Sequence, residues 1–132
     1  MIIGFTGTRK GMTEKQKRRL RILLEVSRSA AASLNVFHHG DCIGADAEAH
    51  DIAVDMKYDV VVHPPKNPRY RAFKRGIRTL RVQDYLDRNK NIVDSCEYLI
   101  AAPSGPEQRR SGTWSTVRYA VKRKRLMIIV KP

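Results

Sequence analysis

Short apolar runs alternate with longer amphipathic stretches along the chain, and this alternation predicts its strands and helices. The apolar runs predict buried strands at residues 1–5, 35–39, 59–63, 97–103 and 126–132. The spacing of apolar residues between these runs predicts helices at residues 13 to about 32, 45–56, 87–96 and 113–123. Strands that alternate with helices form a parallel sheet covered on both faces, so the fold class is α/β.

The first predicted helix has the clearest start signal. Thr13 and Gln16 have the spacing of a capping box, in which two side chains satisfy free backbone N–H groups of the first turn. The pattern that follows directs four leucines toward the core: Leu20, Leu23, Leu24 and Leu34.

Connection rules restrict how the strands are arranged. Right-handed crossovers favour a Rossmann-like doubly wound three-layer sandwich, with a five-stranded, mostly parallel sheet in the order 3-2-1-4-5. The winding then reverses between the first and fourth strands, and ligands bind beyond the carboxyl ends of the strands at such a point. Three polar, glycine-bearing loops meet there: residues 6–11, 40–46 and 104–114. We expect one domain, residues 1–132.

Charge adds a class of partner to this picture. The 26 lysines and arginines outnumber 13 acidic residues, so the net charge of +13 favours polyanions such as nucleic acid. A small protein with basic, solvated faces is the alternative. Cys42 and Cys96 form no CxxC pair and are expected to be reduced thiols in a cytoplasmic protein. No apolar stretch approaches the ~20 residues that span a membrane.

The strongest phosphate signal is the polar segment that opens the last helix. Small residues at a helix start expose its first N–H groups, and arginines beside them add charge, as in phosphate sites. The predicted ligand-binding residues here are Arg110, Ser111, Gly112, Thr113 and Trp114. Trp114 is either a pocket wall or a core residue.

The loop after the first strand adds a second candidate phosphate contact. Its glycine permits close backbone approach, its threonines supply hydroxyls and its arginine can pair with a phosphate. These residues are Thr6, Gly7, Thr8 and Arg9, although an ordinary tight turn explains them equally well alone. Arg88, near the start of the third helix, is a further phosphate contact or a surface cation.

The loop after the second strand contributes Gly40, Asp41, Gly44 and Asp46 to the predicted site. Asp41 ends a strand, so we expect its carboxylate to face the crevice and accept a hydrogen bond from a ribose hydroxyl. Asp46 is a candidate N-cap. A zinc site needs three or four ligands, which this chain does not supply as a motif, so we expect no metal and a hydrogen-bonded His50.

A long connection at residues 63–83 contains three prolines, seven lysines or arginines and no acid. Connections of this length are usually functional or mobile, so we expect a lid or a flexible basic loop. Aromatic side chains among cations suit stacking on nucleic-acid bases. The predicted nucleic-acid rim consists of Lys66, Arg69, Tyr70, Arg71, Phe73, Lys74 and Arg75.

Together these motifs resemble the SLOG superfamily, a Rossmann-like group that includes bacterial DNA-processing protein A and the lonely-guy phosphoribohydrolases. Four segments carry the resemblance in order: TGTR at 6–9, GDCIGADAEAH at 40–50, RNKNIV at 88–93 and RSGTWSTVRYA at 110–120. The likeness is greatest to stand-alone, single-domain proteins of bacteria and phages. It implies a Rossmann-like fold with a crevice for nucleotides or single-stranded nucleic acid.

One departure from this pattern bears on catalysis. The phosphoribohydrolases carry PGGxGTxxE, whose glutamate takes part in cleaving the N-glycosidic bond. Aligned on Gly112 and Thr113, this chain has Thr116 in that place, and threonine is no general base near neutral pH. The resemblance therefore favours binding over cleavage, unless Asp41, Asp46 or Glu107 supplies a carboxylate.

Three functions follow from these features. The first is binding of a nucleotide or nucleotide-derived ligand, with no required cofactor. The second is binding of single-stranded DNA or RNA, and the third is hydrolysis of a nucleoside monophosphate. Related proteins often dimerise, so a homodimer is an open alternative.

Overall fold

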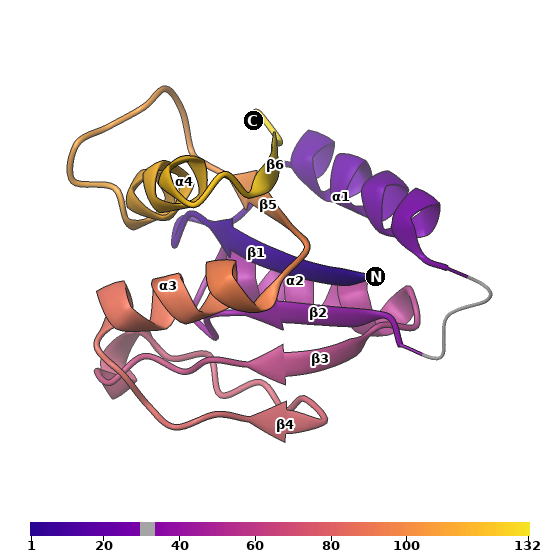
Figure 1. Ribbon diagram of the computed structural model, residues 1–132, viewed down its shortest axis with the longest axis horizontal. Coiled ribbons are helices and arrows are strands. Elements are labelled where there is room, and N and C mark those ends of the chain that lie inside the picture. Colours follow the sequence, from indigo (N-terminus) through magenta and orange to yellow (C-terminus); the bar gives the residue numbers. More distant parts are fainter. Residues whose placement is uncertain (30–33) are drawn as a thin grey trace.

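The computed structural model describes residues 1–29 and 34–132, which form a six-stranded parallel sheet between two layers of helices (Figure 1). The strands are β1 (Ile2–Gly7), β2 (Val36–His39), β3 (Asp59–Val62), β4 (Arg78–Thr79), β5 (Tyr98–Ala102) and β6 (Leu126–Ile129). Their order is β4-β3-β2-β1-β5-β6, with each neighbouring pair parallel. The predicted α/β class and the order of the five predicted strands are confirmed.

The prediction of five strands was wrong by one, because β4 lies inside the long connection at 63–83. It has two residues and pairs with β3, where Arg78 lies opposite Val61 and Thr79 lies opposite Val62. A strand this short has no apolar alternation for a sequence pattern to detect. It occupies one edge of the sheet and adds to the predicted order without changing it.

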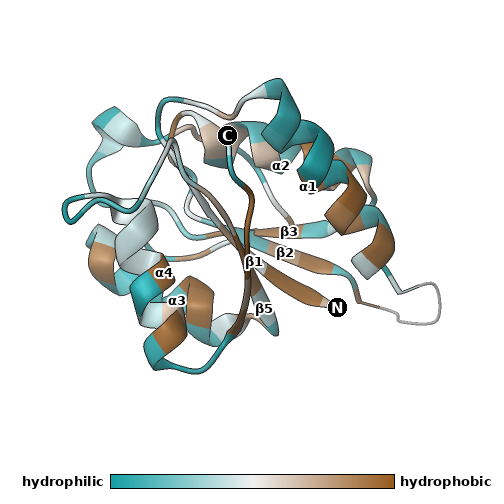
Figure 2. Cartoon of the chain, turned by 90° about the horizontal axis from the view of Figure 1, so that it is seen from above, coloured by the Kyte–Doolittle hydropathy of each residue, from teal (hydrophilic) through white to brown (hydrophobic). Residues whose placement is uncertain are grey.

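Two helices cover each face of the sheet. The helices α1 (Glu14–Ser27) and α2 (Ala45–Asp55) pack together on one face, and α3 (Tyr85–Ser95) and α4 (Gly112–Lys122) pack on the other (Figures 1 and 2). The larger core, which contains Phe5 and Phe37, lies on the α1–α2 side, and a smaller one around Ile92 lies beneath α3 and α4. Each helix of the described residues is too short or too polar to cross a membrane.

Helix α1 begins as predicted and ends earlier. Thr13 and Gln16 form the capping box, and the helix ends at Ser27. The amide of Asn35 bonds both backbone groups of Ser29, at 3.0 and 3.1 Å, in place of helical partners. Residues 30–32 of the predicted helix lie outside the described residues. Leu34, predicted to face the core, is 57% exposed.

The β1–α1 loop packs directly on the start of α2. Gly44, the N-cap of α2, has φ of 88°, and a Cβ there would collide with the backbone carbonyl of Arg9. A Cβ on Gly7 would lie 2.5 Å from the Cβ of Ala45. The expectation that Asp46 caps this helix was wrong, because Asp46 lies within its first turn. These contacts bring two of the predicted site loops together.

Candidate functional site

A cavity of about 730 Å³ lies at the carboxyl ends of β1, β2 and β5, within the size range of small-molecule sites. It occupies the predicted point where the winding of the sheet reverses. Most of the predicted ligand-binding residues line it: Thr6, Gly7, Thr8, Arg9, Gly40, Asp46, Arg88, Arg110, Ser111, Gly112 and Thr113.

Asp41, Gly44 and Trp114 belong to the predicted site and do not line the cavity. The carboxylate of Asp41 is fully buried, where it accepts hydrogen bonds from Arg71 Nε at 3.1 Å and from the backbone N–H of Lys74 at 2.9 Å. The predicted contact of Asp41 with a ribose hydroxyl is therefore wrong, because both carboxylate oxygens are buried and accept hydrogen bonds from Arg71 and Lys74. Trp114 is half-buried on α4.

The N-terminus of α4 opens into the cavity. Ser111 is the N-cap, and its Oγ accepts a hydrogen bond from the backbone N–H of Trp114 at 3.2 Å. The first N–H groups of a helix have no partner within the helix, so those of Gly112 and Thr113 remain for a ligand. Apart from the adjoining residues and the backbone of α4 itself, no atom of the described residues lies within 4 Å of a Cβ built on Gly112, so this helix start is open.

Positive charge without an internal partner gathers at the same cavity. In addition to the buried Arg88, four exposed cations line it: Arg9, Lys10, Lys66 and Arg110. None of these four forms an ion pair with another residue that the structure describes. A helix N-terminus next to unneutralised cations favours a phosphate-bearing ligand.

Arg88 was expected to be a phosphate contact or a surface cation, and the structure shows a buried clamp. Its Nη1 donates to the carbonyl of Gly40 and, at 3.3 Å, to that of His63. Its Nη2 donates to Cys42 Sγ at 3.4 Å. Arg88 thus joins α3 to the ends of β2 and β3 and places its charge in the cavity wall.

Asp46 lies beside this clamp. Its Oδ2 accepts a hydrogen bond from the backbone N–H of Cys42 at 3.1 Å. Asp46 Oδ1 and Arg88 Nε are both buried without a hydrogen-bond partner among the described residues. Burial raises the pKa of Asp46 to about 6, although the Arg88 charge opposes this rise.

The four histidines form two hydrogen-bonded pairs away from the cavity lining. His38 Nδ1 lies 2.8 Å from His63 Nε2, and His39 Nε2 lies 2.9 Å from His50 Nδ1. Burial lowers the pKa of all four imidazoles, so they are neutral at pH 7. His50 is hydrogen-bonded as expected. Within the described residues, no group of three or more side chains is arranged to hold a metal ion.

Residues 63–83, called the strap from here on, are tied to the β2–α2 turn. The backbone N–H of Ile43 donates to the carbonyl of Tyr70 at 2.9 Å, and that of Ala72 donates to the carbonyl of Asp41 at 2.7 Å. The strap includes the 3₁₀ turn η1 (Pro68–Tyr70) and β4. A hydrogen-bonded strap of this kind has a defined path over the protein.

The predicted rim divides between the cavity and the outer surface of the strap. Lys66 and Tyr70 line the cavity, and the guanidinium of Arg9 lies 4.3 Å above the Tyr70 ring. Phe73 is 59% exposed, with the Arg71 guanidinium 4.6 Å from its ring centre. The rim residues outside the cavity lining are Arg69, Arg71, Phe73, Lys74 and Arg75.

Sequence reasoning missed the contribution of α3. Tyr85, Asn89 and Ile92 line the cavity from one face of this helix. Their spacing of i, i+4 and i+7 is the signal that places them together. They were overlooked because only Arg88 was singled out in this helix.

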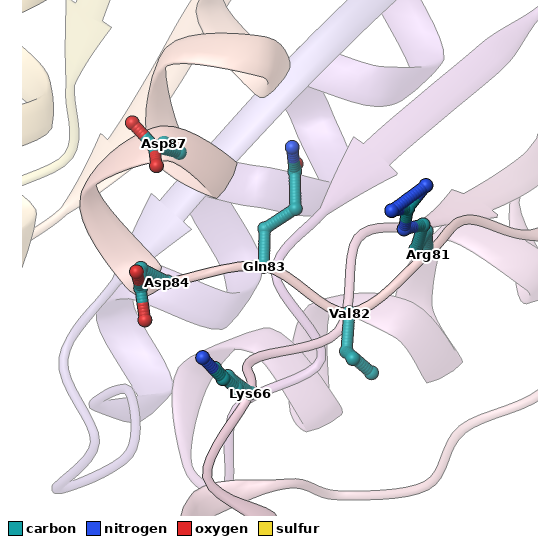
Figure 3. Close-up of a pocket in the computed structure, with 6 residues that line it drawn as sticks. All are labelled: Lys66, Arg81, Val82, Gln83, Asp84 and Asp87. Carbon is teal, nitrogen blue, oxygen red and sulfur yellow. The ribbon is translucent and has the colours of Figure 1, made fainter.

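A second, shallower depression of about 410 Å³ adjoins the cavity (Figure 3). Lys66 and Asp84 line both hollows. Figure 3 shows Val82 and Gln83 pointing to opposite sides of the segment that leads into α3. Its mixed charges, with Asp87 and Arg81 also present, favour no one class of ligand.

The position aligned with the phosphoribohydrolase glutamate is inside the protein. Thr116 is 1% exposed, and its Oγ1 donates to the carbonyl of Gly112 at 2.9 Å. Glu107, a substitute considered from the sequence, pairs with Arg118 at 2.9 Å on the surface. Of the three carboxylates considered, Asp46 alone lines the cavity.

Solved structures share this fold. A molybdenum cofactor binding protein from Rippkaea orientalis matches with a TM-score of 0.73 at 22% identity, over 99% of this chain and 76% of that one. DNA processing protein A from Helicobacter pylori, described by its single-stranded DNA binding mode, matches with a TM-score of 0.69 at 17% identity, over 98% of this chain and 64% of that one. DNA processing protein A from Streptococcus pneumoniae has a TM-score of 0.68 at 15% identity, over 97% of this chain and 49% of that one.

The sequence motifs resembled those of DNA-processing protein A, and two structures of that protein share this fold. These matches confirm the fold that the SLOG resemblance implied. No protein-family model and no curated protein matches the sequence. The chain spans about two thirds and about half of the lengths of the two DNA-processing proteins. At these identities the likeness establishes the shared fold.

Proposed function

We propose that the protein binds a nucleotide or nucleotide-derived phosphorylated ligand in this cavity and holds it without cleaving it. One observation carries the proposal: the open N-terminus of α4 shares a cavity with four cations that have no ion pair among the described residues. A hollow of about 730 Å³ suits a single nucleotide. The ligand's phosphate would accept hydrogen bonds at the start of α4 and pair with Arg110.

Holding is favoured over cleavage because none of the three carboxylates considered from the sequence replaces the missing glutamate at α4. Thr116 is buried against its own helix, and Glu107 is paired on the surface. Asp46 is engaged by the backbone N–H of Cys42 and lies deep beside Arg88. We therefore expect nucleoside monophosphates to be bound and recovered intact, with no free base on chromatography.

The test is titration calorimetry with AMP, ADP and inorganic phosphate. Arg110→Ala removes a cation at the α4 start and should weaken AMP binding by about ten- to a hundredfold, the range of a charged hydrogen bond. Lys122→Ala is the matched control, because it removes the same charge from the exposed far end of α4. Wild-type protein that binds none of the three ligands would refute the proposal.

Single-stranded nucleic acid is the second candidate, and the strap favours it. Two aromatic side chains with stacked guanidiniums, Tyr70 with Arg9 and Phe73 with Arg71, lie on this basic segment. Aromatic side chains among cations are typical of single-strand binding surfaces. One match is described as a cofactor-binding protein and another by its single-stranded DNA binding mode, so both ligand classes occur on this fold.

A further inference from the structure

The side chain of Asn89 has hydrogen-bonding capacity that the protein does not use. It is 9% exposed and lines the cavity from α3, and it makes no hydrogen bond to any described residue. Its amide offers two donors and an acceptor side by side. The polar atoms of this amide are not sealed from solvent, so they are available to a partner that enters the cavity.

Other asparagines of the chain show the contrast. Asn91, two residues further along α3, is exposed and donates to Gln83 Oε1. Asn35 bonds both backbone groups of Ser29. Asn67 accepts a hydrogen bond from the backbone N–H of Arg69 at 3.1 Å. These three amides support the local backbone or a neighbouring side chain, whereas Asn89 supports neither.

The neighbours of Asn89 on α3 define the shape of the partner. Tyr85, one turn earlier, lines the cavity and is 55% exposed, with no hydrogen bond to the described residues. Ile92, one turn later, also lines it and is 1% exposed. An aromatic ring, an amide and an aliphatic floor along one helix face suit a flat heterocycle with polar atoms on its edge.

The chemistry of the amide narrows the ligand further. A phosphate presents only acceptors and has its own donors at the start of α4. An asparagine amide pairs through two bonds with a ring edge that carries an amino group beside a ring nitrogen, as it does with adenine. Asn89 and the α4 start line the same cavity, so one nucleotide can reach both.

We propose that Asn89 is a specificity-determining residue that binds the base of the nucleotide, selecting a heterocycle with an amino group next to a ring nitrogen. This inference rests on the proposed function and adds the orientation of the ligand. Its phosphate lies at α4 and its base lies against α3. Tyr85 contributes a stacking surface for the same base.

The experiment crosses two variants with two ligands. Asn89→Leu keeps the size of the side chain and removes its polar atoms, and it breaks no hydrogen bond to the described residues. It should weaken AMP binding by about three- to tenfold, the range of a neutral hydrogen bond, and leave ribose 5-phosphate binding unchanged. Asn91→Leu, on the same helix and outside the cavity lining, should change neither affinity.

A measurement on the wild-type protein keeps the test independent of the fold of the variant. Replacing the 6-amino group of AMP by hydrogen leaves the Asn89 carbonyl without its donor, so this analogue should bind about three- to tenfold more weakly than AMP. The difference between the two nucleotides should disappear in Asn89→Leu. Equal affinity of the two nucleotides for wild-type protein would overturn the inference.

Failure of the inference and failure of the proposed function give different results. If Asn89→Leu binds AMP as tightly as wild type does, or loses AMP and ribose 5-phosphate equally, base recognition by Asn89 is wrong while the phosphate site stands. If wild-type protein binds neither AMP, ribose 5-phosphate nor inorganic phosphate, both proposals are wrong.

Discussion

Buried polar side chains near the cavity fall into two groups according to where their hydrogen bonds go. Asp41 and Arg88 direct theirs to the protein's own backbone and side chains, and so they shape the site. Thr6, Asn89 and Thr113 are each 6–9% exposed and line the cavity, and their side chains make no hydrogen bond to the described residues. In this set the charged side chains shape the site, and the neutral ones remain available to a ligand.

Acid should destabilise the protein through its histidine pairs. Burial lowers the pKa of His38 to about 4 and that of His63 to about 3, against 6.5 for an unperturbed imidazole. As the pH falls below about 6.5, histidines of the unfolded chain take up protons before those of the folded protein do. The free energy of unfolding should therefore decrease as the pH is lowered from about 6.5 to about 4.

Asp46 has the opposite effect over part of this range, which provides a test. Its pKa is raised to about 6, so the folded protein binds this proton before the unfolded chain does. The resulting stabilisation is present at low pH and is lost as the pH rises through about 6. Asp46→Asn removes this compensation, so its stability should fall more steeply than that of wild type between about pH 7 and about pH 5, by urea unfolding. Parallel pH profiles would contradict this assignment.

At the scale of elements, the strap is shaped by one carboxylate. Asp41 holds Arg71 and the backbone N–H of Lys74, and its own backbone carbonyl accepts from Ala72. Between these contacts Phe73 has a φ of 58°, a backbone conformation that bulky residues rarely adopt. This over-determined path presents Phe73 to solvent with Arg71 beside its ring.

Two aspartates that both bind the strap should differ in their effect on stability. Asp41→Ala leaves Arg71 and a backbone N–H without their buried partner, so it should lower the free energy of unfolding by about 3 kcal/mol or more. Asp51→Ala removes only the exposed ion pair with Lys74, worth about 0–1 kcal/mol. Urea unfolding of both variants measures the difference. Similar losses in both would mean that the strap is not organised by Asp41.

Sequence patterns predicted the longer strands and helices. They failed where a feature depends on a side-chain contact formed only in the folded protein. The five longer strands and their order followed from apolar runs and crossover handedness. The end of α1 was missed because it depends on the Asn35 amide, which reaches back to Ser29. The site loops were found because they follow strands, and Asn89 was missed because its role depends on which α3 face meets the cavity.

At the scale of the whole molecule, several acidic groups form ion pairs with arginines outside the cavity lining. Arg21, Arg28, Arg118 and Arg123 each pair with a carboxylate on the helices or loops. The cations that line the cavity have no such partners among the described residues. Part of the net charge of +13 is therefore available to a ligand at this end of the sheet.

Salt dependence separates the two candidate functions. AMP should bind with a shallow slope of log affinity against log salt, because it carries one phosphate group. A single-stranded oligonucleotide that follows the strap should show a slope of roughly −0.7 for each phosphate contacted. Fluorescence anisotropy at several salt concentrations measures both slopes.

Phe73→Ala gives the matching variant for that comparison. Phe73 lies on the strap outside the cavity lining, so its loss should weaken the oligonucleotide and leave AMP binding unchanged. Tyr70→Ala should weaken the oligonucleotide as well. An oligonucleotide insensitive to both changes would rule out stacking on the strap.

The position of β1 in the sheet determines when the cavity exists during folding. β1 pairs with β2, which follows within about 30 residues, and with β5, which lies more than 90 residues further along the chain. Residues 1–80 contain β1 to β4 and most of the larger core, whereas α4 begins only at Gly112. A chain emerging from the ribosome can therefore build four of the six strands before it contains the proposed phosphate site. Ligand can stabilise only the finished molecule, and it cannot guide the early steps of folding.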